Sequence, residues 1–284
     1  MSLAASLRQE IAAGRFVVAP GAYDCVTAKL IESAGFGAVY MSGGCTAGML
    51  GFPDYGLATM TEMVDNAGRI AGAVAVPVIA DADTGYGNEL NVTRTVREYE
   101  LRGVAAIQLE DQGFPKKCGH LDNKVIVPVE EFVAKIRAAA AARRNQDTII
   151  VARTDARAVS GFEDAVRRMN AALDAGADVA FLEAPQTMAE TEQVPRLVHG
   201  PCLLNVVRGG KSPLIDLRQA DTMGYRIAIV PGLLLAHIIG SCDEILQELR
   251  ETHIHPIPHN NLSIRDMFRR LGSDEWDTLR AQFK

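Results

Sequence analysis

Short apolar runs alternate along this chain with longer amphipathic segments. Four junctions share one form, in which an amphipathic segment ends in a glycine and an apolar run follows: Ser33-Ala-Gly-Phe-Gly-Ala-Val-Tyr40, Leu101-Arg-Gly-Val-Ala-Ala-Ile107, Asp174-Ala-Gly-Ala-Asp-Val-Ala-Phe181 and Thr222-Met-Gly-Tyr-Arg-Ile-Ala228. A glycine at this point suits the left-handed residue that ends a helix before the chain turns back into a sheet. The pattern therefore predicts a repeated unit of one strand and one helix.

Eight such units account for most of the chain. Strands are predicted at Phe16–Ala19, Ala38–Ser42, Val76–Ala82, Ala105–Leu109, Thr148–Arg153, Val179–Glu183, Cys202–Val206 and Arg226–Val230, and helices near residues 24–34, 59–73, 91–102, 130–144, 163–175, 189–199, 215–223 and 232–249. Eight strands that are each followed by a helix close a parallel (β/α)8 barrel, the TIM barrel. We therefore expect an α/β fold in which residues 1–249 form one catalytic barrel domain.

Residues 250–284 lie beyond the barrel count. His253-Ile-His-Pro-Ile-Pro-His259 is expected to be an extended link with solvated histidines, and metal binding there is the less favoured alternative. Two further helices are predicted near residues 262–271 and 274–283. We expect this helical extension to pack on the barrel or on a neighbouring subunit.

The composition excludes several classes of partner. A net charge of −6 does not provide the concentrated basic surface that nucleic acids need. The five cysteines are an odd number without a C-x-x-C pair, which favours reduced thiols in a cytoplasmic protein over a disulfide framework or a zinc site. The longest apolar run, Ile227–Gly240, is too short to span a bilayer, so no membrane role is expected. A small acidic substrate would need local Arg, Lys or a metal ion to hold it.

Polar and ionisable residues gather at the C-terminal ends of the predicted strands, whereas the strand interiors are mostly Val, Ile, Leu and Ala. A barrel enzyme collects its chemistry at this end of its strands. In chain order these residues are Tyr40, Ser42, Gly43 and Gly44, then Asp81 and Asp83, Glu110, Arg153, Glu183 and Asn205. The sequence therefore predicts an active site at one rim of the barrel.

Four of the acids suggest a metal site. Asp81 and Asp83 alternate along an extended segment, so both side chains should point to one face. Glu110 from the next strand and Asp54 from the Gly51-Phe-Pro-Asp54 loop would complete an all-oxygen cluster, which suits Mg²⁺, with Mn²⁺ as an alternative ion. The competing interpretation is that these acids cap helices or pair with Arg.

Three other groups carry candidate chemistry. Lys116 and Lys117 precede Cys118, and His120 follows it, so we expect an electropositive setting that lowers the thiol pKa and makes Cys118 an acid or a nucleophile. Arg153 is expected to hold an oxyanion, with an ion pair to Glu183 or Asp155 as the alternative. Ser42-Gly-Gly44 could present backbone N–H groups to a carboxylate, although a simple turn is an equal alternative.

Two motifs, Asp81-Ala-Asp-Thr-Gly-Tyr-Gly87 and Lys116-Lys-Cys-Gly-His120, together resemble the isocitrate lyase/phosphoenolpyruvate mutase superfamily. The resemblance extends over most of the barrel, through Gly51-Phe-Pro-Asp54, Leu109-Glu-Asp-Gln112, Val151-Ala-Arg-Thr-Asp-Ala156, Phe181-Leu-Glu-Ala184 and Gly209-Gly-Lys-Ser-Pro213. It implies a Mg²⁺-dependent enzyme that acts on 2-hydroxy or 2-oxo di- or tricarboxylates, with the Lys116–His120 segment in a mobile lid. It also implies a homotetramer in which the last barrel helix is exchanged between subunits.

Within that superfamily, Cys118 is similar to the general acid of the carbon–carbon lyases. Pro231 also favours lyases, because oxaloacetate hydrolases tend to have a hydroxyl residue there. Leu121-Asp-Asn-Lys124 stands where methylisocitrate lyases usually have Arg-Pro-Asn-Lys, and Ala236 where they have Arg, so a dicarboxylate such as a substituted malate is favoured.

The resemblance implies a retro-aldol cleavage. Tyr40 and Arg153 would stabilise the oxyanion, and Ser42 to Gly44 would lie beside the metal-bound carboxylate. Gly119, His120, Glu183 and Asn205 would orient the distal carboxylate. The alternatives are oxaloacetate hydrolase, decarboxylase or phosphonomutase activity on the same scaffold, and a catalytically silent barrel.

Overall fold

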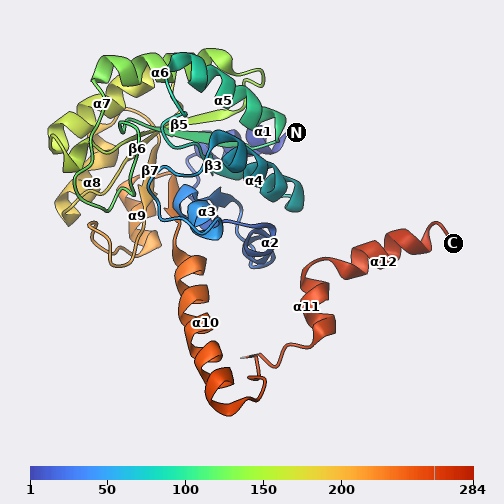
Figure 1. The fold of residues 1–284 in the computed structure, drawn as a ribbon. Helices are drawn as coiled ribbons and strands as arrows, with labels where there is room; N and C mark the ends of the chain where they lie inside the picture. Colours follow the sequence, from blue (N-terminus) through green and yellow to red (C-terminus); the bar gives the residue numbers. More distant parts are fainter. Residues whose placement is uncertain (259) are drawn as a thin grey trace.

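The structure, a computed structural model, describes residues 1–258 and 260–284, so His259 of the expected link lies outside the described residues. Eight parallel strands pair in sequence order and close into a barrel, in which β8 pairs with β1 (Figure 1). The strands are β1 (Val17–Ala22), β2 (Val39–Met41), β3 (Val78–Asp81), β4 (Ala106–Glu110), β5 (Ile149–Thr154), β6 (Val179–Leu182), β7 (Cys202–Asn205) and β8 (Ile227–Val230). The predicted (β/α)8 barrel is confirmed.

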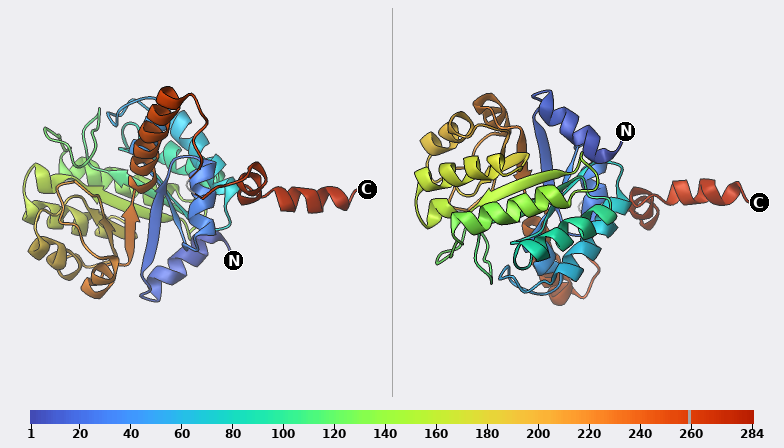
Figure 2. Two further views of the ribbon diagram at one scale, coloured as in Figure 1. Left: turned by 90° about the horizontal axis from the view of Figure 1, so that it is seen from below. Right: turned by 90° about the horizontal axis from the view of Figure 1, so that it is seen from above.

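Helices surround the barrel, as the two views in Figure 2 show. Those that match the predicted segments are α2 (Cys25–Ser33), α4 (Met60–Ala73), α5 (Glu89–Leu101), α6 (Val129–Ala142), α7 (Phe162–Asp174), α8 (Met188–Leu197), α9 (Leu217–Met223) and α10 (Leu233–Thr252). A short 3₁₀ turn, η1 (Ala156–Ala158), follows β5. Helix α10 continues past residue 249, the expected end of the barrel domain.

Two helices were not predicted, α1 (Leu3–Ala12) and α3 (Gly43–Met49). In α1, Ser2 caps the first turn, and Leu7 and Ile11 are buried against the residues inside the barrel. Arg8 of α1 pairs with Asp178 just before β6, at 2.8 Å. Helix α1 therefore closes the N-terminal end of the barrel and leaves the opposite end for the site.

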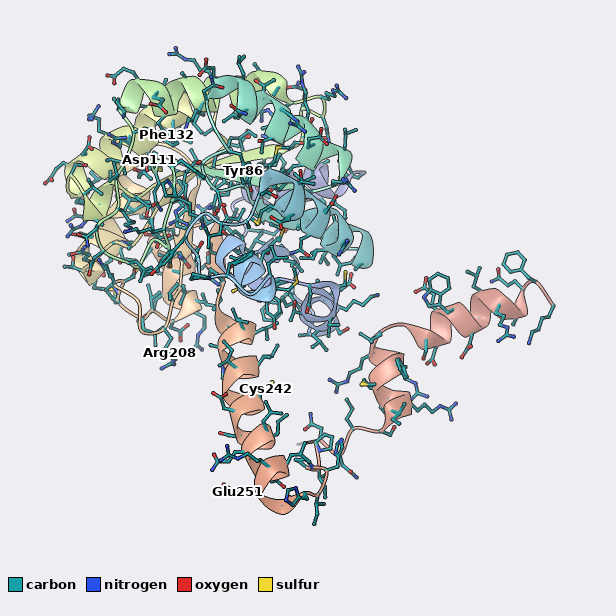
Figure 3. All side chains as sticks on the ribbon, in the orientation of Figure 1. Tyr86, Asp111, Phe132, Arg208, Cys242 and Glu251 are labelled. Atoms are coloured by element: carbon teal, nitrogen blue, oxygen red, sulfur yellow. The ribbon has the colours of Figure 1, made fainter. Side chains whose placement is uncertain are left out.

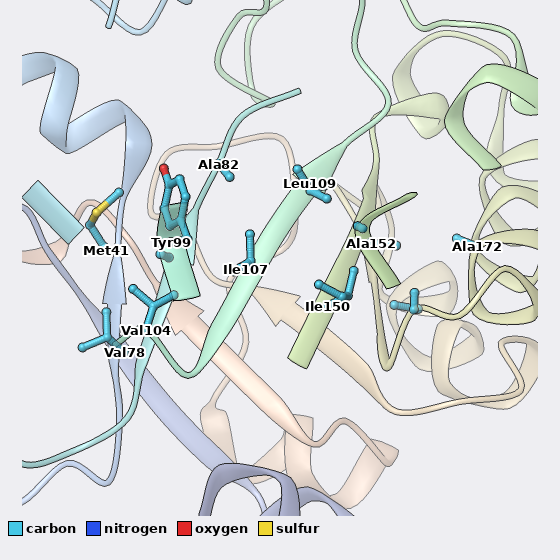
Figure 4. Close-up of a cluster of buried hydrophobic side chains, with 14 of the residues drawn as sticks. Met41, Val78, Ala82, Tyr99, Val104, Ile107, Leu109, Ile150, Ala152 and Ala172 are labelled. Carbon is cyan, nitrogen blue, oxygen red and sulfur yellow. The ribbon is translucent and has the colours of Figure 1, made fainter. Parts of the chain in front are cut away.

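The apolar core has two shells. Residues such as Ile79 and Val151 point into the barrel, while their neighbours Ala80, Ile150 and Ala152 pack between the strands and the helices. Figure 4 shows part of the outer shell. Because side chains alternate along a strand, this register also decides which polar residues face inward at the strand ends.

The C-terminal segment projects away from the barrel. Helix α10 extends outward, and α11 (Ile264–Arg270) and α12 (Ser273–Ala281) follow it, as Figures 1 and 3 show. Helix α11 contacts α2. Ile239 and Leu246 of α10 are 54% and 61% exposed, and Trp276 of α12 is 70% exposed. None of the helices within residues 1–258 and 260–284 combines the length and the apolar character that crossing a bilayer requires.

Candidate active site

The predicted site residues meet at a cavity of about 240 Å³ at the C-terminal rim of the barrel. The ends of β2, β3, β5, β6, β7 and β8, the start of α3, the Asp54 loop and residues 116–120 contribute to it. Its lining comprises Tyr40, Ser42, Gly44, Cys45, Asp54, Asp81, Lys116, Cys118, Gly119, His120, Arg153, Glu183, Asn205, Val207, Pro231 and Gly232. Three further predicted residues, Gly43, Asp83 and Glu110, lie directly behind this lining and contact Asp81, Lys116 and Arg153 respectively.

Asp81 organises the floor of the cavity. Its carboxylate accepts hydrogen bonds from the backbone N–H of Gly43 at 3.2 Å and of Asp83 at 3.0 Å. Gln108 Nε2 donates to the same carboxylate at 3.1 Å, and the Tyr40 hydroxyl lies 3.3 Å from it. The Tyr40 hydroxyl also donates to Gln108 Oε1 at 2.9 Å, so its single proton is engaged within the barrel.

The Ser42-Gly-Gly44 segment is neither an open nest nor a simple turn. Ser42 caps α3 by accepting a hydrogen bond from the Cys45 N–H, and Gly43 and Gly44 form the first turn of this helix. A Cβ at Gly43 would lie 2.6 Å from Asp81 Oδ2, and one at Gly44 would lie 2.9 Å from Asp54 Oδ2. The two glycines therefore let the helix start approach the acids closely, and the Gly43 N–H serves Asp81.

Lys116 lies among the rim acids, the name used below for Asp54, Asp81, Asp83 and Glu110. Its ammonium is 2.5 Å from Asp54 Oδ1 and 2.7 Å from Asp83 Oδ1. Burial raises the pKa of Asp83 to about 6, and Lys116 opposes that shift. Asp83 also adopts a left-handed φ of 47°, which is uncommon for a residue with a side chain.

Glu110 has the least compensated charge of the four. Neither carboxylate oxygen accepts a hydrogen bond from any residue in the described part of the chain, although Arg153 Nη1 is 3.3 Å away. Burial raises the pKa of Glu110 well above its usual range, against the opposing effects of Arg153 and Lys116. A buried carboxylate in this state favours a nearby cation.

The rim acids fit a hard divalent ion bound largely through water. Among the residues that the structure describes, no group of three His, Cys, Asp or Glu side chains is arranged to hold a metal ion by itself. Mg²⁺ commonly takes only one or two protein carboxylates and keeps several waters. The all-oxygen donor set and the uncompensated Glu110 oxygens are consistent with Mg²⁺ or Mn²⁺.

Arg153 makes the ion pairs that the sequence offered as the alternative, and it also reaches the cavity. Its guanidinium pairs with Asp155 at 3.0 Å and lies 3.7 Å from Glu183, so the alternative ion pairs are present. It also lines the cavity and stacks over the Phe181 ring, 5.2 Å from the ring centre. The surrounding carboxylates fix the plane of the guanidinium beside the cavity.

The expectation of a lowered Cys118 pKa is wrong. Burial raises the pKa of the thiol, and a backbone hydrogen bond from His120 only partly opposes this effect. The Lys116 ammonium, which the sequence placed beside the thiol, pairs with Asp54 and Asp83 instead. Cys118 therefore keeps its proton near neutral pH, which suits a proton donor and not a thiolate nucleophile.

His120, Glu183 and Asn205 form one polar group beside the cavity. The Lys211 N–H donates to His120 Nδ1 at 3.0 Å, which leaves the neutral ring with its proton on Nε2, 3.1 Å from Glu183 Oε1. Asn205 Nδ2 donates to Glu183 at 3.1 Å. Burial would raise the Glu183 pKa, but Arg153, His120 and Asn205 together lower it to about 2.

This group holds a permanent charge at the side of the cavity. His120 Nδ1 is used in this conformation, whereas Nε2 makes no hydrogen bond to the described residues although Glu183 Oε1 lies 3.1 Å away. The predicted contact between His120 and a distal carboxylate would use Nε2. Asn205 Oδ1 accepts no hydrogen bond from the described residues and remains open to a donor.

Residues 111–127, called the lid below, cover the cavity. Their two ends pair with each other through a bridge between Gln112 and Ile126 and through the Val127 N–H, which donates to the Asp111 carbonyl at 2.9 Å. At the tip, the Cys118 N–H donates to the Asp54 carbonyl at 3.2 Å. The lid is therefore held at its stem by its own backbone and at its tip by the rim.

Several residues of the site were missed from the sequence. Gln108 was read as part of an apolar strand, yet a polar residue two positions before Glu110 must share its inward face. Gln112 clamps the Lys117 backbone in the lid with hydrogen bonds of 2.8 Å and 3.0 Å. Lys124 lies near the stem of the lid, two residues before Ile126, and its burial carried no local signal.

Comparison with known proteins supports the sequence resemblance. Residues 7–250 match the family model for phosphoenolpyruvate phosphomutase. The 2,3-dimethylmalate lyase of Eubacterium barkeri is 51% identical over 232 residues, which cover 81% of this chain and 80% of that protein.

Solved structures agree in fold over nearly the whole chain. A crystal structure of 2,3-dimethylmalate lyase, a PEP mutase/isocitrate lyase superfamily member, has a TM-score of 0.95 at 40% identity and covers 99% of this chain and 95% of that one. Oxaloacetate acetylhydrolase in complex with the inhibitor 3,3-difluorooxalacetate has a TM-score of 0.95 at 37% identity, with 99% and 97% covered. This chain therefore belongs to the phosphoenolpyruvate phosphomutase family, within the PEP mutase/isocitrate lyase superfamily that its motifs resemble.

Proposed function

We propose that this protein is a carbon–carbon lyase that cleaves the C2–C3 bond of a substituted 2-hydroxy dicarboxylate, such as an alkylated malate. The products are a 2-oxo acid such as pyruvate and a second carboxylic acid. One observation carries this proposal: the Cys118 thiol, which burial keeps protonated, lines the same small cavity as Arg153 and the rim acids.

The chain's own groups account for the bond changes. The 2-hydroxyl proton passes to a carboxylate of the rim acids, the carbonyl forms at C2, and the electrons of the C2–C3 bond pass to C3. Arg153 stabilises the negative oxygen, while the Cys118 Sγ–H protonates C3 of the departing acid. The Tyr40 hydroxyl, which donates to Gln108 in this structure, would stabilise the same oxygen by exchanging that hydrogen bond for one to the substrate.

A divalent ion completes this scheme. Mg²⁺, or Mn²⁺, would be held by Asp81, Asp83, Glu110 and Asp54, partly through water, and when bound would polarise the 2-oxygen and its carboxylate. The start of α3 from Ser42 to Gly44 borders the place where that carboxylate would lie. The closed lid would exclude water from the reacting atoms.

The cavity lining favours a dicarboxylate with alkyl groups. Cys45, Val207 and Pro231 supply an apolar wall beside the polar residues. Leu121 and Ala236 provide no positive charge for a third carboxylate. The similarity to 2,3-dimethylmalate lyase fits the same class of substrate.

Oxaloacetate hydrolase activity is the second candidate, because the likeness to oxaloacetate acetylhydrolase is equally close in fold. Pro231 argues against it: the residue has no side-chain hydroxyl, and its carbonyl already accepts a hydrogen bond from Cys45 Sγ at 3.4 Å. Decarboxylase and phosphonomutase activities remain rivals on the same scaffold.

Product analysis separates these candidates. The enzyme with MgCl₂ would be incubated in parallel with substituted malates, isocitrates, oxaloacetate and phosphonopyruvate. Pyruvate or another 2-oxo acid from a substituted malate is the expected result, and EDTA should abolish it. Oxalate and acetate from oxaloacetate, without turnover of any hydroxy acid, would establish the hydrolase instead.

We also propose a homotetramer in which α10 and the extension from residue 250 pack on neighbouring subunits. The apolar side of α10, with Ile238, Ile239, Ile245, Leu246 and Leu249, is at least two-fifths exposed in the single chain, and a further subunit would bury it. The five free cysteines are consistent with a cytoplasmic enzyme.

A further inference from the structure

Lys124 is a buried lysine to which the proposed reaction assigns no role. Its side chain is 1% exposed, although it belongs to the lid. An ammonium this deeply buried must find partners, because an unpaired buried charge is strongly disfavoured. Lys124 Nζ donates to Asp155 Oδ1 at 2.6 Å and to the carbonyl of Gly119.

The first partner, Asp155, controls the position of Arg153. The Asp155 carboxylate, which is not part of the cavity lining, holds Arg153 Nε at 3.0 Å and Nη2 at 3.3 Å. The Asp155 backbone N–H is fixed in turn by Asp111 at 2.9 Å. Asp155 thus accepts hydrogen bonds from Lys124 of the lid and from Arg153 of the barrel.

The second partner, Gly119, follows Cys118 directly. A Cβ on Gly119 would lie 2.4 Å from Arg153 Nη2 and 2.6 Å from Glu183 Cγ, so this part of the lid is in close contact with the barrel rim. Gly119 and Lys124 both belong to the lid, so the hydrogen bond between them joins two parts of the lid, whereas the bond from Lys124 to Asp155 ties the lid to the barrel. The bond to Gly119 also fixes the peptide next to the thiol.

We propose that Lys124 is a positioning residue that couples closure of the lid to the placement of Arg153 and Cys118. Its ammonium joins the Gly119 carbonyl on the lid to the Asp155 carboxylate that holds Arg153. Opening the lid removes Asp155, one of the two partners of a buried charge, which favours the closed state. The catalytic consequence of this inference rests on the proposed lyase function, whereas the lid contact does not.

The test is hydrogen exchange of the lid amides in Lys124→Met, a substitution that keeps the length of the side chain and removes its charge. Exchange is measured in the presence of oxalate and MgCl₂ as the probe, because oxalate resembles the planar enolate of a 2-oxo acid. We expect the amides of residues 114–123 to exchange about tenfold faster than in the wild type, as fits loss of a charge-assisted hydrogen bond. Unchanged lid exchange would overturn the proposal.

Lys135→Met is the matched control. Lys135 is also a buried lysine, but it lies on α6 and pairs with Glu131 within that helix. In Lys135→Met, the lid amides should exchange at the wild-type rate. Equal acceleration of lid exchange in both variants would mean that Lys124 only stabilises the protein in general, and it would overturn the proposal. If Lys124→Met does not fold, Lys124→Gln takes its place with the same expected direction.

Turnover gives a second readout once a substrate is known. Lys124→Met should lower kcat more than it raises KM, because the contact positions groups for the reaction rather than binding substrate. In Lys124→Ala, added ethylammonium should restore part of kcat, and failure of every alkylammonium to do so would count against the proposal. Hydrogen exchange is measured without turnover. If lid exchange responds to Lys124→Met as expected but the protein cleaves no hydroxy acid, only the lyase assignment is overturned.

Discussion

Lys116 Nζ lies 2.7 Å from Asp83 Oδ1, which places an ammonium of the lid among carboxylates of the barrel rim. The same ammonium contacts Asp54, so one lysine compensates two acids that the site offers to a cation. The closed lid and a divalent ion therefore act on the same negative charges.

The first prediction follows from this shared compensation. Lys116→Met leaves Asp54 and Asp83 without their ammonium, so added Mg²⁺ should stabilise the variant more than the wild type. We expect about 10 mM MgCl₂ to raise Tm by a few degrees more in the variant, measured by thermal melting. Lys135→Met should show the same Mg²⁺-induced change in Tm as the wild type. If Lys116→Met also shows the wild-type change, the Lys116 ammonium does not compensate Asp54 and Asp83.

The second prediction concerns Cys118. Cys118→Ala removes the proton donor, so kcat should fall by about 10²- to 10⁴-fold while the melting temperature changes little. Because burial raises the thiol pKa, activity of the wild type should persist to a higher pH than an exposed thiol would permit, as a pH–rate profile would show. Cys25→Ser, on α2, serves as the control for thiol removal. Full activity of Cys118→Ala on a confirmed substrate would exclude Cys118 as the donor.

The third prediction links Glu183 to acid stability. Its pKa is lower in the folded protein, about 2, than the ordinary value of 4.5, so its stabilising effect is complete above the unfolded value and is lost as pH falls toward the folded one. Glu183→Gln should cost about 3 kcal/mol in the free energy of unfolding near neutral pH, and this difference should shrink below about pH 4. Urea unfolding at several pH values measures both effects.

The exposed residue Glu244 on α10 offers a matched carboxylate control. Glu244→Gln should change the unfolding free energy by less than about 0.5 kcal/mol at every pH. A difference for Glu183→Gln that stays constant down to the acid limit would show that packing, and not the charge of Glu183, stabilises the site.

The fourth prediction concerns assembly. Ile239→Asp combined with Leu246→Asp places two charges on the exposed apolar side of α10, so the proposed tetramer should dissociate to smaller species in sedimentation measurements. Gln247→Asp adds a charge on the opposite side of the same helix and should leave the mass unchanged. A mass equal to the wild type for the double variant would exclude α10 from the subunit interface.

The local pattern of apolar and polar residues was sufficient to predict the barrel fold. Strands such as β4 and β6 are short apolar runs that follow glycine-ended helices, and eight strand–helix units permit one closed parallel arrangement. The inward direction of Asp81, Glu110 and Arg153 also follows from the sequence, because strand residues alternate and the polar groups continue the inward register. Helix α3 was hidden because its first turn is Gly43-Gly44, which carries the pattern of a turn rather than of a helix.

The ion pairs between side chains and the burial of the site residues depended on the tertiary structure. The sequence by itself determined the fold, the rim that carries the chemistry and the residue types present there, since each of these depends on local periodicity and strand polarity. Only the folded chain decided that Lys116 contacts Asp83, that Lys124 reaches Asp155 and that burial raises the Cys118 pKa. These properties depend on distances between segments far apart in the sequence and on how completely water is excluded, and neither quantity is encoded in the spacing of residues along a chain.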